Sequence, residues 1–381
     1  MRIGIDITSL IYQRGVSRYT RNLIYALLDK QIDLSLYGYS WQQYRWLKAE
    51  AEALVAQQPN AEVAVQRIPP KLLEVLWKLN LKTVATTLPN LDVFHSWDWI
   101  QPPDTTIPLV STIHDLAMLK FPEAAHPSIL KHHQKSWQVL KDREAHLIAI
   151  SRSTKQDIVE LLGYPSYLVH VIYEALPLEV HAVSQTLSEE RYDQLLSELN
   201  LQKPFIFFVG TREPRKNLDR LIQAWEPLQN DFELIIAGET GWDKTSNSHH
   251  YQALQEKGLR FLGRVTDEAL SVLYAEAAVF AFPSLYEGFG LPILEAFHHG
   301  TPVVTANNSG MLEVAGNAAE LVNAESVESI RQGLTTVLSE TLPEQKKRLQ
   351  RMIIRQQMFS WEQVATQTLK VYKQAVEDFK S

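Results

Sequence analysis

The sequence predicts an α/β protein of two doubly wound domains, each built on a mostly parallel sheet with helices on both faces. Apolar runs of strand length alternate with segments of helix length from one end of the chain to the other. Most runs are short and rich in Ile, Val, Leu or Phe, as is typical of parallel strands covered on both faces. The 381 residues, 45% of them hydrophobic, exceed one ordinary core and suit two domains.

The predicted elements follow one another as βαβ units in both parts of the chain. In the first part, strands are predicted at Arg2–Ile7, Leu34–Tyr37, Val93–Ser96, Leu109–His114, His146–Ser151 and Leu168–Tyr173. In the second part, they are predicted at Phe205–Gly210, Glu233–Gly238, Leu259–Gly263, Val279–Phe282 and Pro302–Thr305. The predicted helices include Ser17–Leu28, Pro127–Lys141, Asn217–Leu228, Thr266–Ala277 and an amphipathic one at Trp361–Phe379.

The alternation pauses between Glu174 and Gln202, where apolar clusters are few and Ser and Glu are frequent. It restarts with a new strand after Pro204. We therefore expect Rossmann-like domains at residues 1–180 and 203–358, a linker at 181–202 and a cleft between the domains. The final segment, residues 359–381, is predicted to be a helix that returns to the first domain.

Composition and charge exclude several classes of protein. The chain has no cysteine, so disulfides, thiolate metal sites and cysteine nucleophiles are excluded, and a reducing compartment is favoured. Asp6 interrupts the apolar region that a signal peptide needs, and no apolar run approaches the roughly 18 residues of a membrane span, so we expect the cytoplasm. Basic and acidic residues balance over residues 1–180, the net charge of −7 falls on the rest, and no basic stripe is present. Nucleic-acid binding is therefore excluded.

A glycine-rich turn lies directly after the predicted strand that ends at Phe282. Pro292 stands where the first turn of a helix is expected, a position that favours proline. The backbone N–H groups at such a helix start point outward and form a ready anion site. Here they belong to Phe289, Gly290 and Leu291, and the stretch therefore predicts a phosphate site.

Two carboxylates flank this turn, Glu287 before it and Glu295 about one turn into the helix. Carboxylates accept hydrogen bonds from neighbouring sugar hydroxyls, so their placement indicates hydroxyl recognition. The alternative is plain doubly wound architecture with Glu295 as a solvated helix residue. The turn is not a dinucleotide fingerprint, because Ile293 stands where the third glycine is required, and this argues against a dehydrogenase.

A second polar stretch, Gly210–Leu218, follows the first strand of the second domain and precedes a helix. It places three cations, Arg212, Arg215 and Lys216, at the carboxyl end of a parallel strand, where doubly wound folds bind ligands. A planar guanidinium beside a compact ammonium suits a diphosphate. Solvated side chains before a helix are the alternative.

Together the two stretches resemble the second domain of the retaining GT-B glycosyltransferases of family four. That family carries a Glu-x7-Glu motif, which here runs from Glu287 to Glu295. Gly210–Asn217 matches a Gly-Thr-x-Glu-Pro-Arg-Lys-Asn form common in bacterial polysaccharide hexosyl- and mannosyltransferases. The first-domain and C-terminal segments that also resemble the family are Val93–Ser96, Val110–Leu116, Ala149–Thr154 and Phe359–Glu362.

The resemblance implies a retaining hexosyltransferase that uses a nucleotide diphosphate sugar and a glycan or lipid-linked saccharide acceptor in polysaccharide biosynthesis. UDP-glucose is the favoured donor, with GDP-mannose next. The first domain is then the acceptor side and the second domain binds the donor. No cofactor is expected, and no metal either, because the chain lacks an Asp-x-Asp motif and His132-His133 and His249-His250 have no partner that completes a metal site.

The resemblance also implies roles in diphosphate and sugar binding. Arg215 and Lys216 neutralise the diphosphate, and Glu287 contacts sugar hydroxyls near the anomeric centre. The amides of Phe289, Gly290 and Leu291 contact the diphosphate and the sugar.

Three further roles concern the rest of the donor. Glu295 accepts hydrogen bonds from the ribose hydroxyls, and His114 reaches the donor sugar from across the cleft. The backbone at Arg264 and Val265 meets the nucleobase.

The chain departs from the family pattern at two places. Thr211, followed by Arg212, stands where the family often has an arginine, which leaves open which arginine contacts phosphate. The N-terminal glycine loop usually holds two adjacent glycines, and here only Gly15 remains for a contact with the donor.

Some alternatives stay open. The segment Ile68–Leu79 is apolar with interleaved lysines and fits either a peripheral contact with the inner face of the membrane or a helix packed on the first domain. At the level of function, the rivals are a sugar-nucleotide epimerase of the same fold and a non-catalytic sugar-nucleotide binding protein.

Overall fold

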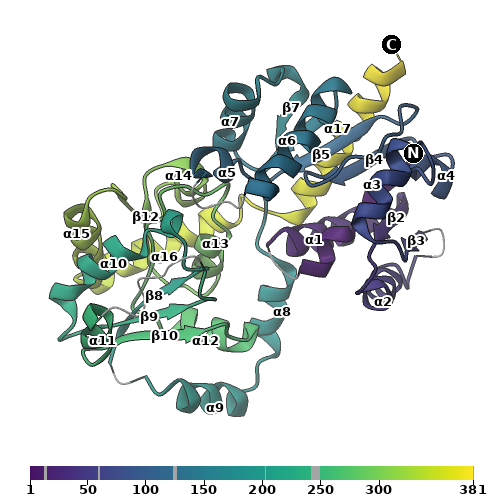
Figure 1. Cartoon of the computed structure of the whole chain (residues 1–381). Helices are drawn as coiled ribbons and strands as arrows, with labels where there is room; N and C mark the ends of the chain where they lie inside the picture. The colour runs from purple at the N-terminus through teal and green to yellow at the C-terminus, as the bar shows by residue number, and fades with distance from the viewer. Residues whose placement is uncertain (13–14, 59–60, 123–126, 202, 242–248, 381) are drawn as a thin grey trace. The chain divides into compact units, whose positions relative to one another are not determined.

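The computed structural model describes residues 1–12, 15–58, 61–122, 127–201, 203–241 and 249–380. The chain forms two compact units and passes from the first into the second and back again (Figure 1). Unit 1 comprises Met1–Glu174 and Ser360–Ser381, and unit 2 comprises Ala175–Phe359. Each unit holds its own parallel sheet, as the strand-rich sequence predicted.

Unit 1 contains, within the described residues, a seven-stranded sheet in the order β3-β2-β1-β4-β5-β6-β7. All neighbouring strands are parallel. The strands are β1 (Arg2–Asp6), β2 (Asp33–Tyr39), β3 (Glu62–Gln66), β4 (Val93–Trp97), β5 (Leu109–Ile113), β6 (His146–Ala149) and β7 (Val169–Val171). The central strands β1, β4 and β5 are almost wholly buried, which explains their continuous apolar character.

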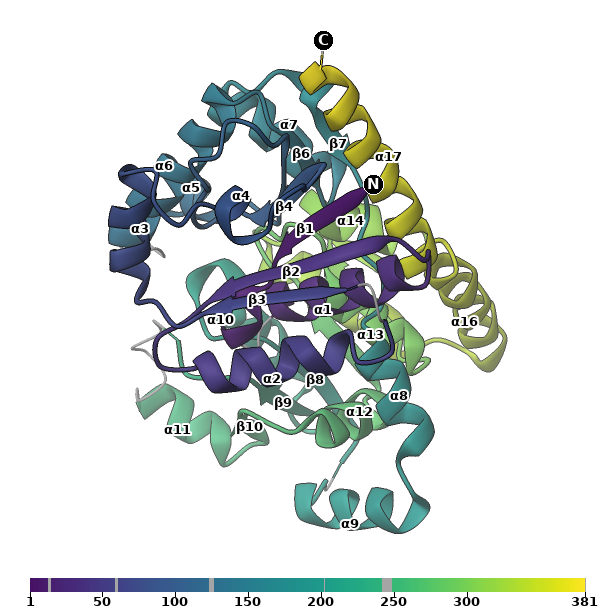
Figure 2. The same ribbon diagram turned by 90° about the vertical axis from the view of Figure 1, so that its right-hand side faces the viewer.

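Helices cover this sheet. They are η1 (Thr8–Tyr12), α1 (Gly15–Leu28), α2 (Tyr44–Leu54), α3 (Pro70–Lys78), α4 (Val84–Thr87), α5 (Ala117–Lys120), α6 (Pro127–Asp142), α7 (Arg152–Leu162), η3 (Ser166–Leu168) and α17 (Trp361–Lys380). The last helix, α17, packs against α1 and buries Trp361, Val371 and Tyr372 (Figure 2). The hydroxyl of Tyr372 lies 2.6 Å from Nδ1 of His95 on β4.

Unit 2 contains, in its described part, a six-stranded parallel sheet in the order β10-β9-β8-β11-β12-β13. Its strands are β8 (Phe205–Val209), β9 (Glu233–Ala237), β10 (Leu259–Gly263), β11 (Val279–Phe282), β12 (Val303–Ala306) and β13 (Glu320–Val322). Its helices are α8 (Leu178–Thr186), α9 (Glu189–Leu199), η4 (Pro214–Lys216), α10 (Leu218–Trp225), η5 (Glu226–Leu228), α11 (His249–Gln255), α12 (Asp267–Glu276), α13 (Leu291–His298), α14 (Ser309–Ala315), α15 (Val327–Leu338) and α16 (Leu342–Gln356).

Two of the four edge strands, β3 and β13, are absent from the sequence prediction. An edge strand pairs on one side only, so it tolerates polar residues and shows no continuous apolar run. β3 begins and ends with polar residues, Glu62 and Gln66, and β13 has three residues. The other strands lie within one or two residues of their predicted bounds.

The expected linker is the largest difference between the sequence prediction and the structure. Most of residues 181–202 form the end of α8 and all of α9, and the division between the units lies at Glu174. Ser188 caps the N-terminus of α9, because its side chain accepts a hydrogen bond from the N–H of Arg191 at 3.2 Å. The stretch is poor in large apolar clusters because it buries only a narrow stripe, which includes Leu195 and Leu199.

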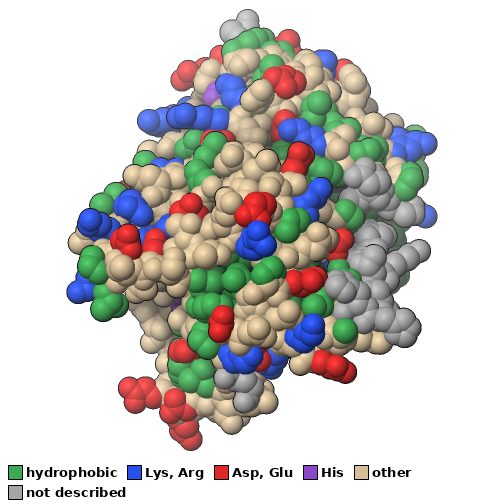
Figure 3. Space-filling model, turned by 90° about the vertical axis from the view of Figure 1, so that its left-hand side faces the viewer, with side chains coloured by type: hydrophobic (Ala, Val, Ile, Leu, Met, Phe, Trp, Pro, Cys, Tyr) green, Lys and Arg blue, Asp and Glu red, His purple; other side chains and the backbone are tan. Residues whose placement is uncertain are grey.

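Charges of both signs are mixed on one face of the protein. On the face drawn in Figure 3, Lys and Arg side chains are interspersed with Asp and Glu. Within the described chain, none of the helices has the length and apolar character needed to cross a membrane. In the segment Ile68–Leu79, α3 buries Leu73 and Trp77 and exposes Leu72 and Val75. The helix therefore packs on unit 1 and also presents an apolar face.

Candidate active site

The sheet of unit 2 reverses its winding between β8 and β11. The chain leaves β8 towards β9 and leaves β11 towards β12, although β8 and β11 are neighbours. In open α/β sheets, ligands bind outside the carboxyl ends of the two strands at such a switch point. Both motif stretches begin here, Gly210–Asn217 after β8 and Pro283–Gly290 after β11.

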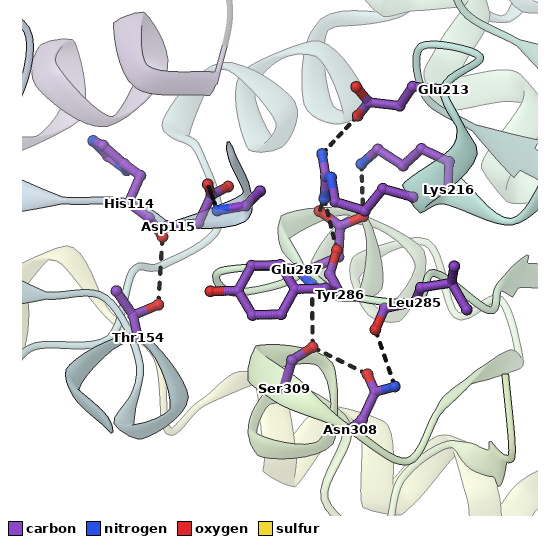
Figure 4. Close-up of polar contacts among 12 residues, drawn as sticks. His114, Asp115, Thr154, Glu213, Lys216, Leu285, Tyr286, Glu287, Asn308 and Ser309 are labelled. Carbon is purple, nitrogen blue, oxygen red and sulfur yellow. Dashed lines mark hydrogen bonds and ion pairs between the residues drawn. The ribbon is translucent and has the colours of Figure 1, made fainter. Parts of the chain in front are cut away.

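Three charged side chains from these loops meet at the switch point. The Arg215 guanidinium donates from Nη1 to Oε2 of Glu287 at 2.7 Å, and Lys216 Nζ donates to Oε1 of the same carboxylate at 2.7 Å. Figure 4 shows Lys216 directed at Glu287. The second arm of Arg215 donates to Glu213 at 2.6 Å. The structure therefore brings together the cations and the first glutamate of the Glu-x7-Glu motif.

This cluster fixes the charge of Glu287. Burial alone would raise the pKa of its carboxyl group, but the charges of Lys216 and Arg215 and their hydrogen bonds outweigh burial and lower that pKa to about 2. Glu287 is therefore ionised at neutral pH. A carboxylate in this state accepts hydrogen bonds and cannot act as a proton donor.

Asn217 holds the two loops together. It occupies the left-handed region with φ of 61°, directly after the short turn η4 that carries Arg215 and Lys216. Its side-chain amide donates to the carbonyl oxygens of Pro283 at 2.9 Å and Ala324 at 2.7 Å. The positions of the cations are thus set by backbone contacts as well as by Glu287.

A third loop, between β12 and α14, supports Glu287 from the other side (Figure 4). The N–H of Glu287 donates to Oγ of Ser309 at 3.1 Å, and Asn308 donates to the carbonyl oxygen of Leu285 at 3.2 Å. A Cβ added to Gly310 would lie 2.4 Å from the backbone oxygen of Gly288, so only glycine fits there. The sequence prediction missed this loop, although the polar run Asn308–Gly310 after a predicted strand is a visible signal.

The glycine turn leads into α13 as expected. Gly290 has φ of 127°, α13 begins at Leu291, and no side chain caps the helix N-terminus. Glu295 is 6% exposed, and its Oε2 accepts a hydrogen bond from the Tyr274 hydroxyl at 2.8 Å. The alternative that Glu295 is a solvated helix residue is therefore wrong. Phe289 is also buried.

Arg212 lies apart from the Glu287 cluster. Its guanidinium sits 4.7 Å from the ring centroid of Phe261 on β10 and donates to the Thr240 hydroxyl. Of the two arginines whose roles the sequence left open, Arg215 is the one that contacts Glu287. Thr211, beside Arg212, is exposed.

Arg264 and Val265 follow the end of β10. The Arg264 side chain is largely exposed and lies 3.8 Å from Glu239. Val265 is partly buried. Their predicted contact with a nucleobase stays a prediction.

His114 and Gly15 belong to unit 1. Nδ1 of His114 lies 3.0 Å from Oε1 of Glu174, and the ring meets Tyr19 edge-on at 4.9 Å. Burial opposes the charged form of His114, but the hydrogen bond and charge of Glu174 outweigh it and raise its pKa. Thr154 donates to the His114 carbonyl oxygen at 3.5 Å (Figure 4). Gly15 starts α1, and an added Cβ would meet nothing within 4 Å.

The histidine pairs have other surroundings. His132 stacks on Trp99, and His133 Nδ1 lies 3.4 Å from a carboxylate oxygen of Asp98. His249 and His250 lie outside the residues whose side chains are described. Among the described residues, no group of three or more His, Asp or Glu side chains is arranged to hold a metal ion.

Comparison with known proteins identifies the family. The model of the family described as "Glycosyl transferases group 1" matches residues 195–356, and that of "Glycosyltransferase Family 4" matches residues 13–180. The O-antigen chain mannosyltransferase B of Escherichia coli is 31% identical over 270 residues, which cover 69% of this chain and 70% of that protein.

A second relative and a solved structure agree. The MMP alpha-(1->4)-mannosyltransferase of Mycolicibacterium hassiacum is 40% identical over 245 residues, 60% of this chain and 54% of that protein. The crystal structure of Anabaena HepE in complex with UDP and glucose has a TM-score of 0.66 at 16% identity and covers 98% of this chain and 100% of that one. This chain therefore belongs to the family-four glycosyltransferases and has their GT-B fold of two Rossmann-like domains.

Proposed function

We propose that the protein transfers a hexose from a nucleotide diphosphate sugar to a saccharide acceptor and retains the anomeric configuration. The observation that carries this proposal is the cluster of Arg215, Lys216 and Glu287 at the β8–β11 switch point. Two cations on adjacent residues match the two phosphates of a donor. The ionised carboxylate between them matches the hydroxyls of the sugar that the diphosphate carries.

The proposed reaction is a front-face displacement. The acceptor hydroxyl oxygen bonds to the anomeric carbon on the face from which the diphosphate leaves, as the bond from that carbon to the phosphate oxygen breaks. The departing phosphate oxygen takes the hydroxyl proton, so no protein group needs to supply one. Arg215 and Lys216 stabilise the charge that develops on the leaving diphosphate. Glu287, with its pKa held at about 2, stays ionised and orients the sugar.

The donor sugar is proposed from the relatives. Both named relatives are mannosyltransferases, which favours mannose over the glucose that the sequence resemblance put first. The test is the melting temperature of the protein with UDP-glucose, GDP-mannose, UDP-galactose and GDP. A ligand that binds the folded state raises the melting temperature. The expected result is a clear rise with one nucleotide sugar, followed by transfer of its hexose to a methyl glycoside, detected by mass spectrometry.

The same assay separates the rival functions. Donor hydrolysis that disappears in Lys216→Ala excludes a non-catalytic binding protein. A donor that is converted into its epimer without acceptor would overturn the proposal. We also propose that transfer needs no metal, and loss of activity in EDTA with recovery in manganese would refute this.

The proposed acceptor includes lipid-linked saccharides, for which α3 gives a physical reason. Leu72 and Val75 of α3 and Leu79 directly after it are exposed. Lys71 and Lys78 lie beside them in the sequence, a pattern that suits an anionic lipid surface. We expect co-sedimentation with phosphatidylglycerol vesicles that Lys71→Glu with Lys78→Glu abolishes. Equal sedimentation of both proteins would contradict a membrane contact at α3.

A further inference from the structure

Unit 1 has a switch point of its own, between β1 and β4. The chain leaves β1 towards β2 and leaves β4 towards β5, although β1 and β4 are hydrogen-bonded neighbours. The crevice outside their carboxyl ends is therefore the expected ligand site of this sheet. Aromatic residues lie beyond both strands. Tyr12 ends η1, which follows β1; Trp97 is the last residue of β4, and Trp99 lies two residues further on.

These three side chains form a continuous row, which we call the aromatic row. The ring centroids of Tyr12 and Trp97 are 5.6 Å apart. Trp97 and Trp99 follow at 6.1 Å with their planes 19° apart, and Trp99 stacks on His132 at 5.2 Å with planes 1° apart. Tyr12 is 49% exposed, and both tryptophans are partly exposed. Packing alone would bury such large apolar rings, so the row presents aromatic surface to solvent.

The loop that carries Trp99 is fixed by hydrogen bonds. The side-chain amide of Gln101 donates to the carbonyl oxygen of Trp97 and to the Ser136 hydroxyl, both at 2.9 Å. The Ser96 hydroxyl donates to Gln101 at 2.5 Å. Since these contacts exist in the protein alone, the row is preorganised, and binding to it needs little ordering of side chains.

One polar group of the row has no partner. The indole Nε1–H of Trp97 is buried and finds no hydrogen-bond acceptor among the described residues. Because this nitrogen is closed to solvent, it is also closed to a ligand, and the row offers ring surface rather than a hydrogen-bond donor. Trp97 also lines a small hollow together with Asp6 and His114, so within unit 1 the row adjoins the histidine that is predicted to reach the donor sugar.

We propose that the aromatic row binds a pyranose ring of the acceptor. The C–H face of the ring packs on the part of the row that is open to solvent, which includes the half-exposed Tyr12 ring and the exposed parts of Trp97 and Trp99. The inference rests on the proposed function, since it names the class of acceptor and the site that takes it.

The test measures saturation-transfer NMR of the whole chain with the methyl glycosides of mannose, glucose, galactose, rhamnose and N-acetylglucosamine. At least one glycoside is expected to receive saturation at its ring protons. Trp99→Ala should weaken its binding about tenfold, and Trp99→Phe should keep most of it, because a ring still fills the position. Trp97→Phe, which also keeps a ring, should behave like Trp99→Phe.

A matched control is Trp41→Ala. Trp41 is also in unit 1 and 51% exposed, with the Arg67 guanidinium 4.9 Å from its ring, but it is outside the row. This variant should bind the glycoside as the unmodified protein does. Absence of saturation transfer from every glycoside overturns the proposal, as does undiminished binding in Trp99→Ala or equal loss in Trp41→Ala.

A second readout separates this site from the donor site. Trp99→Ala should raise the acceptor KM while leaving acceptor-free hydrolysis of the nucleotide sugar unchanged. Loss of donor hydrolysis in this variant would refute a role confined to the acceptor. If glycosides bind the row but no nucleotide sugar is bound or hydrolysed by the unmodified protein, the proposed function fails and the sugar site stands.

Discussion

The two sheets of this protein reverse their winding in the same way but carry different chemistry where they do so. At the β8–β11 switch point, Arg215, Lys216 and Glu287 form an ionic cluster. At the β1–β4 switch point, Trp97 ends β4 and its ring contacts Tyr12, which ends η1 after β1. Topology fixes where a ligand can bind, and the loop residues decide which ligand it is.

The two switch points also differ in the charges that surround a buried carboxylate. Glu287 lies between cations, whereas the contacts of the Asp6 carboxylate within the described residues are hydrogen bonds from Thr8, including the Thr8 N–H at 2.8 Å. Burial raises the pKa of Asp6 to about 6, and the contacts with Thr8 oppose this only in part. Ionised Glu287 stabilises the fold above its ordinary pKa of 4.5, and this contribution is lost as the pH falls towards 2.

The largest expected effect comes from Glu287→Gln. The variant keeps the shape of the side chain and removes the charge that orients the sugar, so turnover should fall by about 10²-fold or more. Affinity for the nucleotide diphosphate product should stay near normal, since that product has no sugar. Steady-state kinetics and titration calorimetry measure the two quantities.

Glu213→Gln is the control for this variant, because it also removes a carboxylate beside Arg215 but not the one between both cations. Turnover of the control should stay within a few-fold of the unmodified protein. Similar losses in the two variants would mean that the net charge of the cluster matters and Glu287 does not act on the sugar.

Asp6→Asn tests the β1–β4 switch point through the free energy of unfolding. In the folded protein Asp6 holds its proton up to about pH 6, while the unfolded chain releases it near 3.8, so stability falls as the pH rises between these values. The asparagine variant lacks this fall and should be about 3 kcal/mol more stable at pH 7. Melting temperatures from pH 4 to 7 measure the slope, and exposed Asp33→Asn should keep it.

Glu295→Ala should raise the donor KM about tenfold and leave turnover nearly unchanged. The proposed ribose contact is the same in substrate and transition state, so its loss removes uniform binding. Binding of the nucleotide diphosphate should weaken by the same factor. Tyr274→Phe removes the hydroxyl that donates to Glu295 and keeps the ring. It is the control that shows how much of the effect comes from the loss of this hydrogen bond. Weak nucleotide binding in Glu287→Gln together with normal binding in Glu295→Ala would reverse the two assignments.

The smallest effect is expected from Ser309→Ala. The variant removes the acceptor of the Glu287 N–H, which costs about 1 kcal/mol and lowers turnover about five-fold. Rescue by Ser309→Thr, which restores a hydroxyl, would show that the hydrogen bond is responsible. An unchanged rate in Ser309→Ala would mean that Asn217 and the cations alone position Glu287.

Sequence patterns predicted the sheets well because buried parallel strands are apolar throughout, as in Phe205–Val209. They also place Lys216 and Glu287 in loops that follow strands, and their roles in the site stay predictions that rest on the family resemblance. The patterns could not show that these two side chains contact each other. That contact depends on the pairing of β8 with β11, which sequence patterns do not predict. The aromatic row was missed for the same reason: only the pairing of β1 with β4 brings Tyr12 beside Trp97.

The return of the chain to unit 1 has a consequence for biosynthesis. Unit 2 is one uninterrupted stretch, whereas unit 1 is completed by α17, whose Tyr372 contacts His95 across 277 positions of the sequence. A ribosome therefore delivers all of unit 2 before it delivers the helix that closes unit 1. Unit 2 can therefore fold first. Until α17 is synthesised, the strands of unit 1 keep apolar surface exposed, to which chaperones can bind. Ribosomes that stall before Ser360 would leave a folded unit 2 beside an unfinished unit 1.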